Sequence, residues 1–439
     1  GMKVNSNSLI KNWVFSTLRS NVIKNIFSLY IIHFANYLLP LIVVPYLVRV
    51  LSPSGFGIVS FAQSLIAYLT IFVDYGFALS ATRKISVYRN NKIEVSRIFF
   101  NVLAAKGFLG LIGFIVLLLL TSLIPQFKEI STLLIILYGT IVGNILFPIW
   151  LFQGLEKMVF ISVINLATKI LMVIGIFLFV KSSQDYLLYA IILSVSSMFA
   201  GFIGIILAMW RFKIDFTMPS LQGIWKELKD GWILFLSMAS VSLYTAGNPL
   251  ILGLLTNNHT IVGYYSAAER IVKAVLGLLG PISQAVYPRF SKMAAESKDL
   301  ALQWGKRMLV LMGGIGFFLS FVIFLSSPLI VRLILGSDYI PSIAVMQILA
   351  WLCFLIAVSN VLGIQIMLPF GRDKAFTSII FGAGVINVIL AVLLVPTWYE
   401  LGMALSVLIS ELFVTAAMFI YLTLNQLNPL KTIAKEVKQ

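Results

Sequence analysis

The sequence has almost none of the side chains that build disulfides, metal sites and catalytic triads. Its 439 residues include a single cysteine, Cys353, and two histidines, His33 and His259. One cysteine allows no internal disulfide and no cysteine-based metal site, and the histidines are far apart without a carboxylate cluster beside them. We therefore expect no metal, no cofactor and no enzymatic activity.

Charged residues are also scarce. They make up 11% of the chain, against 60% for hydrophobic residues, and the mean hydropathy is +1.01. A water-soluble surface requires more charge than this. The longest polar stretches, near residues 81–97, 211–230 and 289–307, are too short to fold as independent domains. This composition predicts a membrane protein without a large extramembrane catalytic domain.

Apolar runs recur along the whole chain, and each is long enough, at about 18 residues or more, to cross a hydrocarbon core of ~30 Å as a helix. The pattern predicts an all-α, polytopic membrane protein with twelve transmembrane helices. We place them at roughly 25–49, 58–80, 98–124, 130–153, 158–180, 186–210, 232–256, 260–288, 307–335, 341–369, 374–396 and 399–424.

The formal net charge of +16 is consistent with a nucleic-acid partner, but the positions of the basic residues argue against one. Of the 32 lysine and arginine residues, 24 fall on one side of the predicted membrane. The opposite side has only Arg49, Lys128, Lys181 and Arg332. Cytoplasmic flanks are enriched in basic residues, so both termini are predicted to be cytoplasmic and no nucleic-acid partner is expected.

Two segments have the spacing of amphipathic helices that lie in the plane of the membrane surface. Residues 9–22 show the weaker pattern. In residues 220–232 apolar side chains repeat at helical spacing opposite charged ones, and the two sets are Leu221, Ile224, Trp225, Leu228 and Trp232 against Lys226, Glu227, Lys229 and Asp230.

A weak internal repeat divides the chain into two halves. A constant shift of 206 residues aligns the two halves, and the aligned pairs include Gly57 with Gly263 and Gln63 with Glu269. Six helices per half, an even number, predict two parallel lobes, residues 1–215 and 216–439. The substrate path of such an architecture lies between the lobes, near the bilayer midplane.

Prolines fall inside the first predicted helix of each half, at Pro40, Pro45 and Pro249. Each removes a backbone hydrogen bond and favours a bend, so these residues are candidates for gating. The alternative is that they have no role in gating, because membrane helices often contain proline.

Seven charged residues remain inside the predicted spans, where a charge at mid-bilayer costs about 2.5 to 3.5 kcal/mol or more. Such a residue normally faces a cavity or a partner. The seven are Asp74, Lys106, Lys169, Glu269, Arg270, Lys273 and Glu411.

The span at 260–288 contains three of these residues. Glu269 and Lys273 are four residues apart and can pair on one helix face, which leaves Arg270 without a partner on its own helix. A guanidinium binds phosphate oxygens in a bidentate fashion, so Arg270 is the first candidate ligand for a phosphorylated or other anionic substrate, with Lys273 beside it. The alternative is a structural pair between Arg270 and Glu411, which lies mid-span in the last helix.

Two further basic residues lie inside the N-terminal half. Lys169 is near the midplane of its span and is a candidate for binding the same anion from the opposite lobe. Asp74 and Lys106 are each nine residues from a basic flank, so they lie at about the same depth, ~13 Å, and an ion pair is expected. The alternative role for Lys106 is anion binding. The carboxyls of Asp74, Glu269 and Glu411 are candidates for coupling transport to a proton or ion gradient.

Several short motifs resemble those of the O-antigen and polysaccharide-unit flippases, and the likeness extends over nearly the whole chain. These flippases are part of the multidrug/oligosaccharidyl-lipid/polysaccharide exporter superfamily. The motifs are 36–40 (Asn-Tyr-Leu-Leu-Pro), 45–47 (Pro-Tyr-Leu), 51–57 (Leu-Ser-Pro-Ser-Gly-Phe-Gly), 74–76 (Asp-Tyr-Gly) and 150–158 (Trp-Leu-Phe-Gln-Gly-Leu-Glu-Lys-Met).

The resemblance implies a V-shaped, MATE-like pair of six-helix lobes around a cationic cavity, in the bacterial inner membrane. The substrate that it implies is an undecaprenyl-diphosphate-linked oligosaccharide repeat unit of the O-antigen or capsule type. This lipid is made on the cytoplasmic face and is flipped outward by alternating access. Membrane lipid and the polysaccharide polymerase machinery are the further partners that it implies.

Two alternatives belong to the same superfamily. A peptidoglycan-precursor flippase moves a related lipid but usually has fourteen helices, against the twelve predicted here. An ion-coupled multidrug extruder has similar lobes, but a cavity with Arg270, Lys273 and Lys169 is expected to repel organic cations. A polysaccharide polymerase or ligase would be an enzyme with a long outer loop, whereas the outer connections predicted here are all short.

Overall fold

The computed structural model describes residues 21–430, and within that range the chain is helical with short connections. Its first part contains α2 (Asn21–Asp74), α3 (Phe77–Val87), α4 (Lys92–Leu123), α5 (Pro125–Glu129), α6 (Ser131–Leu146), α7 (Ile149–Gly154), α8 (Met158–Phe179), η1 (Ser183–Asp185) and α9 (Tyr186–Trp210). Its second part contains α10 (Leu221–Thr245), α11 (Asn248–Thr256), α12 (His259–Leu276), η2 (Gly277–Leu279), α13 (Gly280–Glu296), α14 (Lys298–Ile330), η3 (Val331–Leu335), η4 (Ser337–Tyr339), α15 (Ser342–Ala350), α16 (Leu352–Asn360), η5 (Val361–Met367) and α17 (Asp373–Leu424).

Eight helical stretches of residues 21–430 are long and apolar enough to cross a membrane. Two of them, Ile42–Val87 with 46 residues and Asp373–Leu424 with 52, are longer than one crossing requires. The prediction of a polytopic all-α membrane protein is therefore confirmed. These eight stretches do not by themselves establish the predicted count of twelve spans.

The two longest helices each contain one residue with a non-helical backbone. In α2 this residue is Ser52 (φ 63°, ψ 167°), and in α17 it is Tyr399 (φ 49°, ψ −124°). Ser52 precedes Pro53, and a proline disfavours the helical conformation at the residue before it. Ser52 lies between the predicted spans 25–49 and 58–80, and Tyr399 is the first residue of the predicted span 399–424. Each long helix therefore changes direction at or beside a predicted connection.

The region of the seventh and eighth predicted spans is also interrupted. The helix α10 ends at Thr245 and α11 begins at Asn248, while η2 separates α12 from α13. The three prolines that were predicted to bend helices occupy different positions in the structure. Pro249 lies in the first turn of α11, next to the break, whereas Pro40 and Pro45 lie within α2. Their role in gating stays a prediction.

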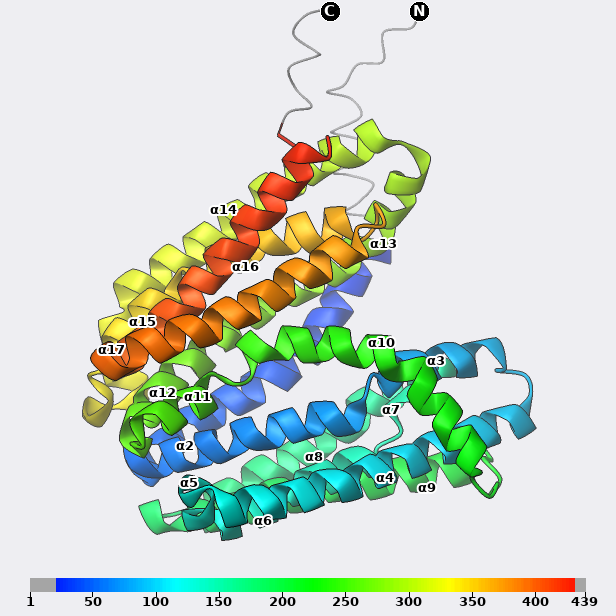
Figure 1. Ribbon diagram of the computed structural model, residues 1–439, viewed down its shortest axis with the longest axis horizontal. Helices are drawn as coiled ribbons and strands as arrows, with labels where there is room; N and C mark the ends of the chain where they lie inside the picture. Colours follow the sequence, from blue (N-terminus) through cyan, green and yellow to red (C-terminus); the bar gives the residue numbers. More distant parts are fainter. Residues whose placement is uncertain (1–20, 431–439) are drawn as a thin grey trace, which may run out of the picture.

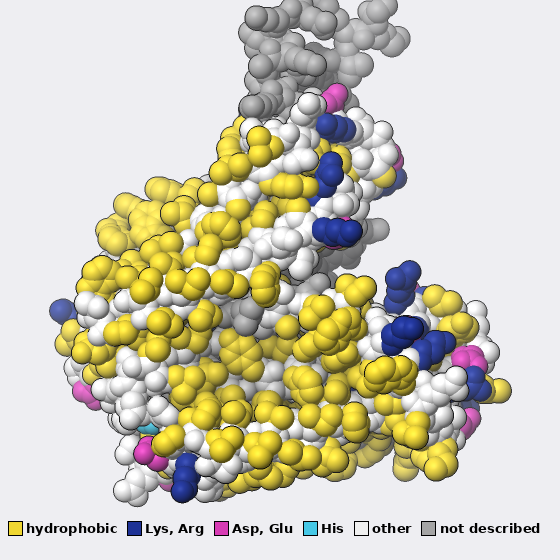
Figure 2. Space-filling model, viewed as in Figure 1, with side chains coloured by type: hydrophobic (Ala, Val, Ile, Leu, Met, Phe, Trp, Pro, Cys, Tyr) yellow, Lys and Arg dark blue, Asp and Glu magenta, His cyan; other side chains and the backbone are white. Residues whose placement is uncertain are grey.

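The helices form two bundles that meet at one end of the molecule and diverge toward the other (Figure 1). One bundle is built mainly from α2–α9 and the other from α11–α17, and α10 lies between them. At the end where the bundles meet, which we name the closed end, α12 packs against α2. At the other end, the open end, the space-filling view shows a notch with lysine and arginine side chains on both of its sides (Figure 2).

The segment predicted as an amphipathic surface helix forms the beginning of α10. Its two acidic residues contact the N-terminal bundle, where Lys84 lies 2.8 Å from Glu227 and 2.6 Å from Asp230. Lys226 and Lys229 are exposed, whereas Ile224 and Leu228 pack against the core. Trp225 and Trp232 are 69% and 49% exposed, on the apolar side that a membrane would cover. Of the second predicted segment, residues 9–20 lie outside the described residues.

Backbone contact is very close at the closed end, at four residues that we name the outer crossing: Pro53 and Gly57 of α2, and His259 and Gly263 of α12. A Cβ added at Gly57 would lie 1.7 Å from the carbonyl oxygen of His259, and one at Gly263 would lie 2.0 Å from that of Pro53. Only glycine permits helices to approach this closely. The two contacts are related by the same 206-residue shift as the sequence repeat.

Candidate functional site

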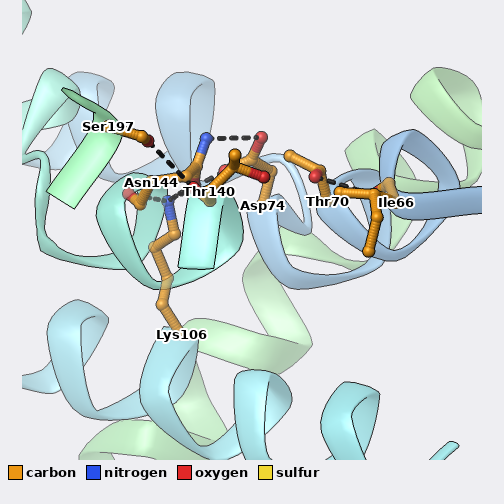
Figure 3. A network of polar contacts seen from close by, with 7 residues as sticks. All are labelled: Ile66, Thr70, Asp74, Lys106, Thr140, Asn144 and Ser197. Carbon is orange, nitrogen blue, oxygen red and sulfur yellow. Dashed lines mark hydrogen bonds and ion pairs between the residues drawn. The ribbon is translucent and has the colours of Figure 1, made fainter. Parts of the chain in front are cut away.

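Lys106 and Asp74 form a buried polar network inside the N-terminal bundle (Figure 3). The residue Lys106, on α4, is 2% exposed. Its ammonium donates to Asp74 Oδ1 at 2.8 Å and to the Oδ1 and backbone oxygen of Asn144 at 2.7 and 3.1 Å. The ammonium also lies 5.2 Å from the centre of the Trp150 ring. All three of its protons have an acceptor, so the expected Lys106–Asp74 pair is present.

A cavity of about 360 Å³ lies beside this network. Helices α2, α3, α4, α6, α7, α8 and α9 contribute to its wall, together with Met238 of α10. Because Lys169 of α8 also lines it, the cavity brings together the two lysines that were predicted inside the N-terminal half. The polar residues of the wall are Asp74, Lys106, Asn144, Asn165, Thr168, Lys169, Ser196 and Ser197.

A second polar cluster lies in the C-terminal half, at the break between α10 and α11. The predicted pair of Glu269 and Lys273 is present at 2.9 Å. Lys273 also donates to the backbone oxygen of Thr245, the last residue of α10, at 2.9 Å. Glu269 accepts from the Tyr265 hydroxyl at 3.2 Å and from the Asn248 amide at 3.4 Å. The pair thus joins the two sides of the helix break, with a cation at a helix C-terminus.

Arg270 reaches across from α12 to α2, in the other half of the chain. Its Nη2 donates to Gln63 Oε1 at 2.5 Å, and its guanidinium lies 4.6 Å from the centre of the Phe56 ring. No ion pair joins it to Glu411 among residues 21–430. Glu411 instead accepts from the Ser359 hydroxyl at 2.7 Å and is 3% exposed. The alternative of an Arg270–Glu411 pair is therefore absent from this conformation.

The candidate residues consequently do not converge on one point. Lys106 and Lys169 share the cavity of the N-terminal bundle, whereas Arg270 lies at the contact between halves, near the outer crossing. Sequence reasoning missed the amides that complete these sites, above all Asn144 and Asn248. The signal that was available is an amide side chain in the middle of an apolar run, since such a group must find a partner within the protein.

Comparisons with known proteins agree with this architecture. A family model described as polysaccharide biosynthesis protein matches residues 22–294. A candidate O-antigen transporter of Escherichia coli (strain K12) is 34% identical over 412 residues, which cover 94% of this chain and 99% of the relative. A candidate O-antigen transporter of Shigella dysenteriae is 31% identical over 402 residues, covering 90% and 98%.

Two solved structures have the same fold. An inward-facing multidrug resistance MATE family transporter of the MOP superfamily matches with a TM-score of 0.67, at 14% identity, covering 89% of this chain and 98% of that one. The lipid II flippase MurJ, in an inward closed conformation, matches with a TM-score of 0.64, at 16% identity, covering 91% and 87%. The predicted MATE-like fold is confirmed.

Proposed function

Because the chain belongs to the polysaccharide biosynthesis protein family, we propose that it is a flippase for undecaprenyl-diphosphate-linked oligosaccharide repeat units of the O-antigen or capsule type. It moves them from the cytoplasmic to the outer leaflet of the bacterial inner membrane. The observation that carries the proposal is the match to the Escherichia coli relative over 94% of this chain and 99% of that protein. This is a family of transporters, not of enzymes. The polymerase machinery would receive the flipped unit.

The topology that we propose has twelve spans in two parallel six-helix lobes, residues 1–215 and 216–439, with both termini cytoplasmic. The changes of direction at Ser52 and Tyr399 support dividing each of the two longest helices into two spans. The paired contacts of the outer crossing support two lobes in the same orientation. Lysine and arginine gather at the open end, which supports its assignment as the cytoplasmic end (Figure 2).

In this arrangement the substrate enters from the cytoplasm through the open end and meets cations at two depths. Lys169 lines the cavity of the N-terminal bundle and is the first ligand of the diphosphate. Arg270, at the far end of the path, is the second, because a guanidinium stays charged when partly desolvated and binds phosphate oxygens in pairs. Lys106 and Lys273 already have carboxylate partners, so each contributes positive potential only over a short distance around its ammonium group.

Coupling to a gradient is assigned to Glu411. Asp74 and Glu269 each contact a lysine, at 2.8 and 2.9 Å. In the described part of the chain Glu411 has no basic partner, and it is buried against Ser359. A buried carboxyl without a counter-ion changes its charge most readily when a proton or cation arrives. Alternating access then requires the outer crossing to separate while the open end closes.

The test is outward translocation of undecaprenyl-diphosphate oligosaccharide in proteoliposomes, with wild type compared with Arg270→Ala at matched protein levels. Wild type is expected to move the lipid and the variant to lose most of this activity. The control variant is Arg332→Ala, which removes a basic residue from the side of the membrane predicted to be extracellular.

Two other outcomes would replace the proposal. Export of a cationic dye without any lipid movement would assign the chain to multidrug extrusion. Movement of a peptidoglycan precursor, but of no undecaprenyl-diphosphate oligosaccharide, would assign it to peptidoglycan synthesis. The similarity to the two solved structures establishes only the fold and does not choose between these substrates.

A further inference from the structure

The contact between Arg270 and Gln63 joins the two halves by a charged donor and a neutral acceptor. The guanidinium is half-buried on α12, and its partners, Gln63 and Phe56, both lie on α2. Phe56 is fully buried, so the stacked position of the guanidinium is fixed by packing. No acidic side chain within residues 21–430 forms an ion pair with Arg270. The amide oxygen of Gln63 therefore occupies a place that an anionic oxygen would fill with a larger gain in free energy.

The outer crossing lies next to this contact along both helices. Gln63 is six residues after Gly57, and Arg270 is seven residues after Gly263, so each is about two turns from the crossing. The Tyr339 hydroxyl adds a buried hydrogen bond to the backbone oxygen of Val48 at 2.9 Å, again between the halves. Both of these hydrogen bonds at the closed end, from Arg270 and from Tyr339, therefore have neutral acceptors.

We propose that Gln63 is a positioning residue that holds Arg270 until the diphosphate arrives, and that exchange of Gln63 for a diphosphate oxygen loosens the outer crossing. This inference rests on the proposed function and adds to it the step by which substrate binding favours opening of the outer end. A ligand shifts a conformational equilibrium only through its different affinity for the two states. The exchange provides this difference, because Arg270 can bind Gln63 only while the two helices are together.

The repeat provides a specific perturbation. Gln63 aligns with Glu269, so a carboxylate at this position already exists in the other half of the chain. Gln63→Glu gives Arg270 a permanent anionic partner of nearly the same shape, and we expect it to hold the outer crossing shut. Gln63→Leu removes the acceptor and is expected to let the crossing open without substrate. Gln303→Glu, on an exposed position of α14, adds the same charge away from the contact and is the matched control.

Opening is measured at Ser60, one turn inward from Gly57. Ser60 is 4% exposed, and its hydroxyl has no hydrogen-bond partner among the described residues, so Ser60→Cys disturbs little. In a Cys353→Ser background, a membrane-impermeant maleimide added outside labels this cysteine only when the crossing is open. The probe lipid is undecaprenyl diphosphate in the opposite leaflet, with undecaprenol as the lipid that lacks phosphate.

Undecaprenyl diphosphate is expected to raise the labelling rate of the wild-type contact by about 5- to 150-fold, the usual range of coupling between two sites. Undecaprenol is expected to have no effect. Gln63→Glu should label slowly with either lipid. Gln63→Leu should label rapidly even when no lipid is added. Thermal melting of each variant excludes unfolding as the cause of rapid labelling.

The proposal is overturned if Gln63→Glu and Gln63→Leu both label at the wild-type rate, with and without the lipid. It is also overturned if undecaprenyl diphosphate binds the wild type but leaves its labelling unchanged. A failure of the proposed function gives a different result, since wild type then neither binds nor moves the lipid. The difference in labelling between the Glu and Leu variants requires no lipid and still reports on the contact.

Discussion

Removal of the Asp74 carboxylate is expected to destabilise the protein more than removal of the whole Lys106–Asp74 pair. Asp74→Asn removes the carboxylate that compensates the Lys106 ammonium, which is 2% exposed, and leaves it with neutral amide and carbonyl oxygens as acceptors. Removing one partner of a buried ion pair costs about 3 to 5 kcal/mol. Because the Asp74 side chain is 30% exposed and water can reach it, we expect the lower end, about 3 kcal/mol.

The reverse single change and the double change complete the cycle. Lys106→Met leaves Asp74, which the cavity can hydrate, so its cost is expected to be smaller, about 1 to 2 kcal/mol. The double variant leaves no buried charge, and replacing such a pair by neutral residues is often nearly neutral. The two single costs and a nearly neutral double variant give a coupling free energy of about 4 to 5 kcal/mol in magnitude, above the usual range of about 0.5 to 3 kcal/mol for contacting residues.

The assay is unfolding of the purified protein in mixed micelles by a denaturing detergent, followed by helical circular dichroism, with transport measured on the same variants. Single-variant costs that simply add in the double variant would refute the reasoning, because the two charges would then not depend on each other. Transport by a stable double variant would show that Lys106 is structural. Loss of transport in a stable double variant would support Lys106 as a ligand of the diphosphate.

Three further results are expected. Gly57→Ala places a methyl group where the backbone of α12 lies, so it should separate the outer crossing and raise maleimide labelling of a cysteine at residue 60 at least severalfold. Gly314→Ala, with open space around it, should leave the labelling unchanged, and equal labelling of the two variants would contradict the close contact. Lys169→Ala should lower transport roughly tenfold, as expected for the loss of one charge-assisted contact of about 1.5 kcal/mol. Lys181→Ala should have little effect, and a similar loss of transport in both variants would indicate nonspecific electrostatics. Glu411→Gln retains the shape of the side chain, so transport should continue without a gradient but should no longer respond to an imposed proton gradient. An unchanged response would show that another residue couples transport to the gradient.

The sequence predicted well whatever depends on distance along one helix. Asp74 and Lys106 were expected to pair because the rise per residue placed them at the same depth, and the contact is present. Glu269 and Lys273 were expected to pair because residues four apart lie on one helix face, and this contact is present as well. Hydropathy likewise predicted a polytopic membrane protein, since burial in lipid requires long apolar runs.

Contacts between the halves could not be derived in this way. Arg270 was expected either to bind substrate or to pair with Glu411, and the structure gives it Gln63 and Phe56 instead. Both partners lie on α2, more than two hundred positions away in the chain, and periodicity within a helix carries no information about which distant helix it faces. The same holds for the cavity beside Lys169, because residues from eight helices form its wall.

The sequence by itself therefore determined the all-helical membrane class and the two ion pairs, because these follow from composition or from the rise and periodicity of individual helices. Only the tertiary structure decided that Lys106 is fully satisfied, that Arg270 joins the two halves, and that glycines bring α2 and α12 into backbone contact. The physical reason is that these features depend on the relative placement of two bundles. That placement is set by the packing of many side chains together, not by any one motif.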